Sequence, residues 1–596
     1  MNLKDLEYPF DPEYIIKKKK SIRRRLLEDD TSSYTDIRIA VLGGYTTDDI
    51  KKVLELFLLN YGIRPEFYES EYNQFYQDAV FDNAELESFA PDLVYVCTSN
   101  RNITTYPALS DTREEVDALL AQEAEKYHTI WEHISEKYHC TIIQNNFEMP
   151  SFRLLGNKDA SDIHGRVNFL SSLNQRFNEY AQTHDNFYIC DINYISADYG
   201  LQAWSDPFYW YMYKYAVAVP AIPYLSFNVA NIIKSVLGKN KKGLVLDLDN
   251  TLWGGVVGDD GVDGIVVGPE ESEGQAYLDF QRYLKLHEQL GVILNIDSKN
   301  DYENAIAGLD HPDGVLKKDD FIEIKANWEP KDRNFIDIAN DLNLLPESLV
   351  FVDDNPAERH IVESNIPGVS APDISDVTYY IQTLDRSGFF EVTTISADDT
   401  KRNEMYRENV RRAMMQSSYS DYGEYLRSLD MHAVIRSFEP VYYARIAQLS
   451  NKSNQFNVTT RRYTQVEIEQ IAVDNSYITL YGKLIDRFGD NGVVSVVIGH
   501  LVGTECQVDL WIMSCRVLKR DMEKAMMDTL VHVCRKKNIS RIHGYYYPTA
   551  KNHMVSELFG SFGFQKIKED NAGNTEWIFE ISDDYTDQNQ VINVEE

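Results

Sequence analysis

The sequence lacks any apolar run near the roughly 18 residues that a membrane-spanning helix needs, so we expect no transmembrane helix. The first residues, MNLKDLEYPF, lack the basic and then apolar order of a secretion signal. Cysteine is scarce, and the six cysteines among 596 residues show neither paired metal-ligand spacing nor a disulfide framework. These absences predict a soluble cytoplasmic protein whose thiols are reduced.

Positive charge is also scarce, because 59 lysines and arginines face 94 acids and the net charge is −35. Such a surface repels phosphate backbones, so we expect no nucleic-acid partner and no membrane insertion. A basic cluster between Lys17 and Arg25 is the exception. A nucleic-acid arm stays open for it, but the solvated face of an N-terminal helix, with Leu26 and Leu27 inward, is favoured.

The length suggests about three or four domains, and 43% hydrophobic residues are typical of globular ones. Alternating strand and helix patterns predict two units with parallel sheets, and a later alternation of short β-rich runs with helices predicts an α+β domain. The expected divisions are a helical segment at 1–35, α/β units at 36–238 and 239–390, a helical connector at 391–430, the α+β domain at 431–582 and an acidic tail at 583–596. The tail has almost no apolar periodicity, so we expect it to be disordered.

The most informative segment is an apolar run that ends in two acids. Residues 244–246 are typical of a buried parallel strand, and Asp247 and Asp249 follow it. Open α/β sheets keep their ligand sites at this carboxyl end of the strands. Paired acids there suit Mg²⁺, which prefers oxygen ligands and usually shares its coordination shell with a substrate phosphate. A solvated turn after a core strand is the alternative interpretation.

Three further segments favour the metal site. The polar residues that end them are Ser298, Lys299 and Asn300 after a second apolar run, Lys331 after Pro330 at a helix start, and Asp353 with Asp354 after a third run. Each segment alone is a weak signal. Together and in this order they predict a site for phosphoryl chemistry, because a metal and one lysine can neutralise phosphoryl oxygens.

This ordered set resembles the four motifs of the haloacid dehalogenase (HAD) superfamily. The resemblance implies that Asp247 is a nucleophile that forms an aspartyl-phosphate, and that Asp249 is the general acid/base. It also implies that Ser298 and Lys331 hold the phosphoryl group. The implied substrate-binding residues are Thr251, Ser298, Lys299 and Asn300, and the implied Mg²⁺ ligands are Asp247, Asp249, Asp353 and Asp354.

The spacing between these motifs leaves no room for an inserted cap domain. Ser298 follows Asp247 by only 51 residues, and Lys331 follows Ser298 by 33. We therefore expect an open site that suits a bulky or carrier-tethered substrate, or a site that another domain of the chain covers.

A longer pattern is more specific than the HAD motifs. It comprises residues 246–258 (LDLDNTLWGGVVG), 298–300 (SKN), 327–331 (NWEPK), 351–359 (FVDDNPAER), 452–462 (KSNQFNVTTRR), 486–492 (DRFGDNG) and 513–518 (MSCRVL). These segments resemble the FkbH-like proteins, HAD subfamily IIIC, from about residue 36 to 582. The resemblance implies a multidomain α/β chain with an SGNH-hydrolase-like (flavodoxin-like) α/β domain, a capless HAD Rossmannoid α/β domain and a GNAT-like α+β domain at 431–582.

In that family, phosphate is removed from 1,3-bisphosphoglycerate and the glyceryl group passes through an enzyme thioester to an acyl carrier protein. Related proteins occur in surface-polysaccharide pathways. The resemblance therefore implies a Mg²⁺-dependent phosphatase and acyltransferase that acts on a small phosphorylated substrate, with an acyl carrier protein or an amino sugar as acceptor. A plain phosphatase of a sugar phosphate and a non-catalytic assembly protein stay open as alternatives.

The sequence departs from the pattern of active relatives in both outer domains. The turn Gly43–Thr46 has no serine where an SGNH hydrolase carries its nucleophile, so we expect a scaffold or docking module there. Arg516–Asp521 lacks both glycines with which acetyltransferases wrap the CoA pyrophosphate. We therefore do not expect CoA, although one phosphate of a phosphopantetheine arm could lie near Lys519 and Arg520.

Three residues are candidates for the acyl-transfer step. Cys515 is the only cysteine inside a family motif, so it is the candidate acyl-accepting thiol, and a buried strand cysteine is the alternative. Asn454 and Arg461 are candidate substrate-binding residues, although each could equally be a structural cap.

Overall fold

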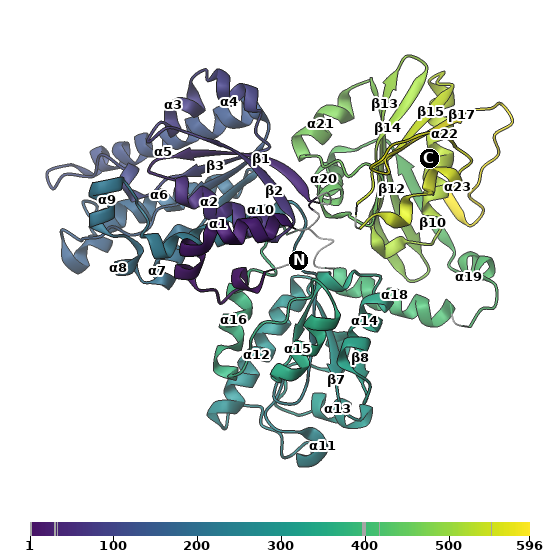
Figure 1. The fold of residues 1–596 in the computed structure, drawn as a ribbon, viewed down its shortest axis with the longest axis horizontal. Helices are drawn as coiled ribbons and strands as arrows, with labels where there is room; N and C mark the ends of the chain where they lie inside the picture. Colours follow the sequence, from purple (N-terminus) through teal and green to yellow (C-terminus); the bar gives the residue numbers. More distant parts are fainter. Residues whose placement is uncertain are drawn as a thin grey trace. The chain divides into compact units, whose positions relative to one another are not determined.

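The computed structural model describes residues 3–28, 31, 34–395, 401–416, 418–549 and 551–595. The chain divides into two compact units, residues 1–236 with 391–394 and residues 237–390 with 395–596 (Figure 1). Among the described residues, no helix combines the length and the apolar character that crossing a membrane requires.

The first unit is built on a five-stranded parallel sheet in the order β2-β1-β3-β4-β5. Its strands are β1 (Thr35–Gly43), β2 (Ile63–Glu69), β3 (Leu93–Cys97), β4 (Thr141–Asn145) and β5 (Phe187–Cys190). Its helices are α1 (Pro12–Glu28), α2 (Asp48–Asn60), α3 (Phe75–Val80), α4 (Ala84–Phe89), α5 (Arg113–Tyr138), α6 (Arg166–Ala181), α7 (Ile192–Tyr199), α8 (Leu201–Trp204), α9 (Pro207–Tyr213) and α10 (Ile222–Val236). All five residues of β3 are buried, as expected for a parallel strand covered on both faces.

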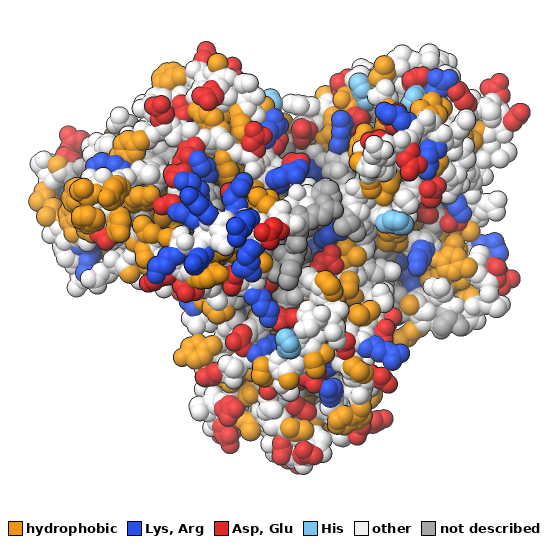
Figure 2. Space-filling model, viewed as in Figure 1, with side chains coloured by type: hydrophobic (Ala, Val, Ile, Leu, Met, Phe, Trp, Pro, Cys, Tyr) orange, Lys and Arg blue, Asp and Glu red, His pale blue; other side chains and the backbone are white. Residues whose placement is uncertain are grey.

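The basic cluster lies on α1, where Lys and Arg side chains gather on the surface (Figure 2). Ile15, Ile22 and Leu26 form the buried side of this helix, but Leu27 is exposed, so its expected inward position was wrong. At 100° per residue, Leu27 falls outside the narrow apolar stripe that the other three define. Arg23 pairs with Glu55 at 2.9 Å, so the cluster is partly neutralised within the unit.

The second unit begins with a four-stranded parallel sheet in the order β8-β7-β6-β9. Its strands are β6 (Gly243–Leu246), β7 (Ile293–Ser298), β8 (Phe321–Ala326) and β9 (Leu349–Val352), and its helices are α11 (Val257–Asp260), α12 (Ser272–Gln289), α13 (Tyr302–Leu309), α14 (Lys331–Asp341), α15 (Pro356–Asn365) and α16 (Tyr380–Arg386). Leu246 is in register with Ile296 of β7 and Val352 of β9, so the carboxyl ends of three strands meet. Between residues 247 and 331 lie only α11, α12, β7, α13, a short 3-10 turn (Lys318–Asp320) and β8, and no cap is inserted there, as the spacing predicts.

The same unit continues through a connector, α18 (Arg402–Gln416) and α19 (Tyr422–Ser428), into a mixed sheet (Figure 1). The described strands run in the order β16-β17-β15-β14-β13-β12-β10-β18, and β11 pairs with β14. Their bounds are β10 (Met431–Arg436), β11 (Phe456–Asn457), β12 (Tyr477–Asp486), β13 (Gly489–Val502), β14 (Glu505–Met513), β15 (Arg541–Tyr546), β16 (Gln565–Glu569), β17 (Thr575–Glu580) and β18 (Ile592–Glu595), with α20 (Tyr443–Lys452), α21 (Gln465–Val473), α22 (Met522–Lys536) and α23 (Leu558–Ser561). The multidomain α/β fold class expected from the sequence is confirmed.

The acidic tail is ordered, contrary to expectation. Asp528 of α22 accepts hydrogen bonds from the backbone N–H groups of Gln588 and Asn589, at 3.0 and 2.8 Å. Ile592 is buried and opposite Met431, where β18 adds a parallel strand to β10. Composition could not reveal this, because the order comes from one buried carboxylate and an unpaired strand edge in another part of the chain.

Candidate active site

Three carboxylates from two strand ends lie together with one lysine. Oxygens of Asp247, Asp353 and Asp354 all lie within 4.8 Å of one another. Lys331, at the first position of α14, places its Nζ 2.9 Å from Asp247 Oδ2 and 2.6 Å from Asp353 Oδ2. The backbone N–H of Asp247 donates to the carbonyl of Val352 at 2.9 Å, so the two strand ends are held in contact.

The electrostatics of this group follow from its burial. Burial raises the pKa of Asp353 to about 6, and the charge of Asp247 adds to the rise. Burial and Asp247 also raise the pKa of Asp354. Burial alone would lower the pKa of Lys331, but the two carboxylates outweigh it and the pKa is raised, so the lysine stays charged. One cation thus faces three acids, which leaves negative charge for a second cation to neutralise.

The side chain of Asp249 lies outside the three-carboxylate group, although the sequence placed it among the metal ligands. Its Oδ1 accepts from the indole N–H of Trp253 at 2.9 Å and from the backbone N–H of Val257 at 3.0 Å. Its Oδ2 accepts from Asn300 Nδ2 at 3.0 Å. Asn250 has a φ of 56° and turns the chain sharply after it. Burial raises the pKa of Asp249 against the effect of these donors, which favours a carboxyl that exchanges a proton over a permanent anion.

The other predicted substrate-binding residues surround this group in different ways. Ser298 ends β7 and is buried, and its carbonyl accepts from the backbone N–H of Asn300 at 3.0 Å. Thr251 is fully buried, and its Oγ1 accepts from the backbone N–H of Asp354 at 3.3 Å. Thr251 therefore supports the turn that carries Asp354, one of the three grouped acids. Lys299 is more exposed and pairs with Glu358 at 2.6 Å.

Two residues near the site were not given a role in it from the sequence. Arg359 is buried, and its NH1 donates to the carbonyls of Asp353, Asp354 and Ile374 at 2.7, 2.8 and 2.9 Å. A charged residue one turn into a helix after an acidic strand end was the available signal. Asp297 is fully buried beside Ser298, and burial raises its pKa to about 8. An acid inside an apolar strand run was the signal there.

Cys515 lies at the junction between the connector and the C-terminal sheet. It is half-buried, whereas the other five cysteines are buried, and all six are free thiols. Its side chain packs against the hydrophobic cluster that contains Phe351 of β9 and Tyr406 of α18. Cys515 is therefore the least buried cysteine of the chain, and it borders the core of the domain that carries Asp247.

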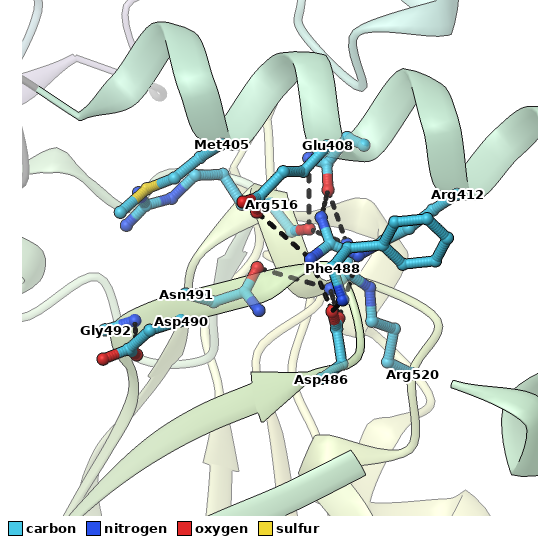
Figure 3. A network of polar contacts seen from close by, with 11 residues as sticks. Met405, Glu408, Arg412, Asp486, Phe488, Asp490, Asn491, Gly492, Arg516 and Arg520 are labelled. Carbon is cyan, nitrogen blue, oxygen red and sulfur yellow. Dashed lines mark hydrogen bonds and ion pairs between the residues drawn. The ribbon is translucent and has the colours of Figure 1, made fainter. Parts of the chain in front are cut away.

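The family motifs of the C-terminal domain form a buried polar network with α18 (Figure 3). Arg412 binds both oxygens of Asp486, with Nε at 2.9 Å and NH2 at 2.7 Å. Arg520 adds a third contact to Asp486 at 3.1 Å and donates to Asn409 at 2.6 Å. Arg516 contacts the sulfur of Met405 in the same network. These residues clamp the connector onto the sheet, which gives them a structural role.

The expected phosphate contacts in this loop are largely taken up. Lys519 and Asp521 have φ values of 64° and 61°, so the loop keeps left-handed backbone at both positions where acetyltransferases carry glycine. Arg520 is buried, however, and the carbonyl of Lys519 accepts from the hydroxyl of Tyr422. A phosphopantetheine phosphate would therefore have to displace contacts within the chain.

The two other predicted substrate-binding residues of this domain have partners. Asn454 Oδ1 accepts a hydrogen bond from the guanidinium of Arg462. The same guanidinium donates to the carbonyls of Ser450 and Asn451. Asn454 thus belongs to a cap at the end of α20. Arg461 pairs with Asp509 of β14 at 3.0 Å and keeps more than half of its side chain exposed.

In the turn after β1, Gly44 offers no room for a side chain. A Cβ added to Gly44 would lie 2.4 Å from the side-chain oxygen of Asn102, so no serine fits there without rearrangement. Thr46 Oγ1 donates to the carbonyl of Tyr213, and Thr47 Oγ1 donates to Glu69, each at 2.7 Å. Neither hydroxyl accepts a hydrogen bond from the first turn of α2, although threonine is a preferred residue for capping a helix start in this way. The SGNH resemblance of this domain stays a prediction.

Comparison with known proteins supports the expected family. Residues 38–234 match the family model described as FkbH, N-terminal domain. The chain is similar to the N-terminal part of the protein BF1531 from Bacteroides fragilis, whose crystal structure contains a phosphatase domain and was complexed with Mg. The identity is 29% and the TM-score 0.58, over 63% of this chain and 99% of that chain. The resemblance to the FkbH-like proteins that the motifs predict is confirmed, with the family model matching residues 38–234.

Other similar solved structures are more distant and match about a quarter of the chain. The ribosomal-protein-S18-alanine N-acetyltransferase from Escherichia coli is 12% identical over 26% of this chain and 98% of its own, with a TM-score of 0.21. Ard1 from Thermoplasma volcanium is 19% identical over 25% of this chain and 99% of its own, with a TM-score of 0.20. Nothing about the chemistry of this chain follows at such similarity. No curated protein matches the chain significantly.

Proposed function

We propose that this FkbH-like chain is a Mg²⁺-dependent phosphatase of the HAD type that acts through an aspartyl-phosphate. The observation that carries the proposal is the contact of Lys331 with both Asp247 and Asp353 at the meeting point of three parallel strand ends. A lysine between a nucleophilic carboxylate and a metal-site carboxylate serves phosphoryl transfer, because its ammonium group can pair with the nucleophile before the attack and with the phosphoryl oxygens after it.

The residues suit a two-step reaction. Asp247 would attack phosphorus through one carboxylate oxygen, and the bond from phosphorus to the leaving oxygen would break. Asp249 would give its proton to that oxygen, as its raised pKa favours. In the second step Asp249 would take a proton from a water that attacks phosphorus, so that inorganic phosphate leaves and Asp247 is restored.

The carboxylate group fits Mg²⁺. Three acids supply hard oxygen ligands from two adjacent turns, and they outnumber the one lysine. The BF1531 structure, which was complexed with Mg, supports the same assignment. Asp247, Asp353 and Asp354 would hold the ion, which when bound would neutralise oxygens of the phosphoryl group. Arg359 would keep the last two in place through their carbonyls.

We propose an activated phosphorylated acid as the substrate class, with acyl transfer as a second activity. Attack by Asp247 at the phosphorus of an acyl phosphate would release a free carboxylate that is no longer activated for transfer. The Asp247 site would therefore hydrolyse a phosphate ester of the substrate. An acyl phosphate on the same molecule would instead react at its carbonyl carbon with the Cys515 thiolate, which forms a thioester and expels phosphate. The position of Cys515, the least buried of the six cysteines, beside the phosphatase-like core supports this order. The acyl group would then pass to a carrier protein or an amino sugar.

The test is release of inorganic phosphate from 3-phosphoglycerate and from para-nitrophenyl phosphate by the purified full chain. We expect turnover with Mg²⁺, none with EDTA, and none in Asp247→Asn that keeps the wild-type melting temperature. Turnover that survives in Asp247→Asn would overturn the proposal. Thioester formation is tested separately, by the mass of the intact protein after incubation with an acyl phosphate, with Cys515→Ala as the control.

A further inference from the structure

One large aromatic side chain is exposed at the rim of the proposed phosphatase site. Trp328 is 71% exposed. The tryptophans that are nearly or fully buried are Trp131, Trp204, Trp253, Trp511 and Trp577. Because so little of the Trp328 ring is removed from solvent, its packing contributes little to folding.

The ring is nevertheless held in place by the loops of the site. The indole Nε1 donates to Asp301 Oδ1 at 2.9 Å, and Asp301 follows the asparagine that binds Asp249. The preceding residue, Asn327, donates its backbone N–H to the carbonyl of Ser298 at 3.1 Å. Lys331, which contacts the nucleophile, follows three residues later. Trp328 is therefore tied by its indole to the loop that follows β7, and it stands three residues before Lys331.

An exposed aromatic ring that is oriented by a hydrogen bond offers a flat apolar face to a ligand. No cap domain covers this site, so the rim loops are what a substrate meets outside the phosphate-binding group. We propose that Trp328 is a specificity-determining residue, whose ring packs against the carbon skeleton of the phosphorylated substrate while the phosphoryl group lies at Asp247 and Lys331. Asp301 is the positioning residue for the ring. The inference rests on the proposed function, and it specifies that the site selects its substrate by the carbon skeleton attached to the phosphate.

The first test compares two substrates of different reach. In para-nitrophenyl phosphate an aromatic ring extends beyond the phosphate, whereas acetyl phosphate has only two carbons. Trp328→Ala is expected to raise KM for para-nitrophenyl phosphate about three- to tenfold, the size of a single aromatic contact, and to leave kcat and the KM for acetyl phosphate unchanged. Trp328→Phe restores part of the effect. Equal changes for both substrates, or no change for either, would contradict the proposal.

The matched control uses the hydrogen bond of the ring. Asp301→Asn keeps an oxygen acceptor for the indole and is expected to behave as the wild type. Asp301→Ala removes the acceptor and is expected to raise KM for para-nitrophenyl phosphate, by less than Trp328→Ala does, and to leave KM for acetyl phosphate unchanged. A general loss of activity in Asp301→Ala with both substrates would mean that the loop, and not the ring, matters.

A binding measurement keeps the inference separate from the phosphatase proposal. Quenching of tryptophan fluorescence by acrylamide reports chiefly on the exposed ring, and the Trp328→Phe protein identifies its share. Phenyl phosphate with Mg²⁺ is expected to protect that share, and inorganic phosphate with Mg²⁺ is not. Absence of hydrolysis would refute the phosphatase, whereas absence of protection by phenyl phosphate would refute the role of Trp328.

Discussion

Asp249 is the residue at which the proposed chemistry makes its sharpest prediction. Asp249→Asn replaces a carboxyl of raised pKa with a group that can neither give nor take the proton. Turnover of an alkyl phosphate such as 3-phosphoglycerate should fall by about 10²- to 10⁴-fold, the usual contribution of a general acid or base. That loss corresponds to about 3–5 kcal/mol in the activation barrier.

The leaving group decides which step is lost. The carboxylate that leaves acetyl phosphate needs no proton. Attack by Asp247 on the phosphorus of acetyl phosphate should therefore persist in Asp249→Asn. The water that follows still needs a base, so the second step should slow and the phosphorylated protein should accumulate. Asparagine also retains an oxygen that can accept from Trp253 or Val257, which preserves part of the local structure.

The assay is the mass of the acid-quenched intact protein after mixing with acetyl phosphate and Mg²⁺, with Cys515→Ala in every variant so that the thiol cannot react with the acyl group. We expect a gain of one phosphoryl group in Asp249→Asn, little in the wild type, and none in the double variant with Asp247→Asn. Wild-type turnover of 3-phosphoglycerate by Asp249→Asn would refute the reasoning. So would equal slowing of both substrates without any phosphorylated protein.

Four further predictions concern single side chains. Arg412→Met leaves Asp486 buried without its bidentate partner and should lower the free energy of unfolding by about 3–5 kcal/mol. The double variant with Asp486→Leu should lose less than the sum of the two single losses, and urea unfolding of the C-terminal domain measures each loss. Arg359→Met should weaken Mg²⁺ binding in calorimetry more than it lowers the melting temperature, because its guanidinium fixes two metal-site carbonyls; equal Mg²⁺ affinity would count against this role. The pKa of Asp297 is raised to about 8, so the folded state binds a proton that the unfolded chain loses near pH 4, and metal-free stability should fall as pH rises from about 4 to 8. Asp297→Asn should make that fall smaller in melting curves and leave the part that comes from the raised pKa of Asp353, and an unchanged pH profile would contradict this role. Cys515→Ala should abolish any thioester and leave phosphate release from para-nitrophenyl phosphate intact, and an acyl adduct that persists would place the transfer elsewhere.

The strand ends of the site were predictable because each follows a short apolar run. Asp247, Ser298 and Asp353 end three such runs, and parallel strands bring their carboxyl ends to one edge. The orientation of Asp249 was not predictable in the same way. It lies beyond the strand, where the left-handed turn at Asn250 and a distant asparagine decide which way the carboxyl points.

The parts that the sequence did not predict depend on contacts between distant segments. Asp486 appeared as a polar residue of a family motif, but its role comes from Arg412 on a helix more than seventy residues earlier. The tail was expected to be disordered from its composition, yet Asp528 and the free edge of β10 hold it. Asn454 could not be told from a ligand contact, because its partner Arg462 caps the same turn only once α20 is folded.

The most direct test of the central claim is a crystal structure of the full chain with Mg²⁺ and beryllofluoride, a mimic of the phosphoryl group on aspartate. We predict beryllofluoride on a carboxylate oxygen of Asp247 and within reach of Lys331, with Mg²⁺ bound to Asp247 and at least one of Asp353 and Asp354. Beryllofluoride on another side chain, or Mg²⁺ away from these acids, would contradict the account.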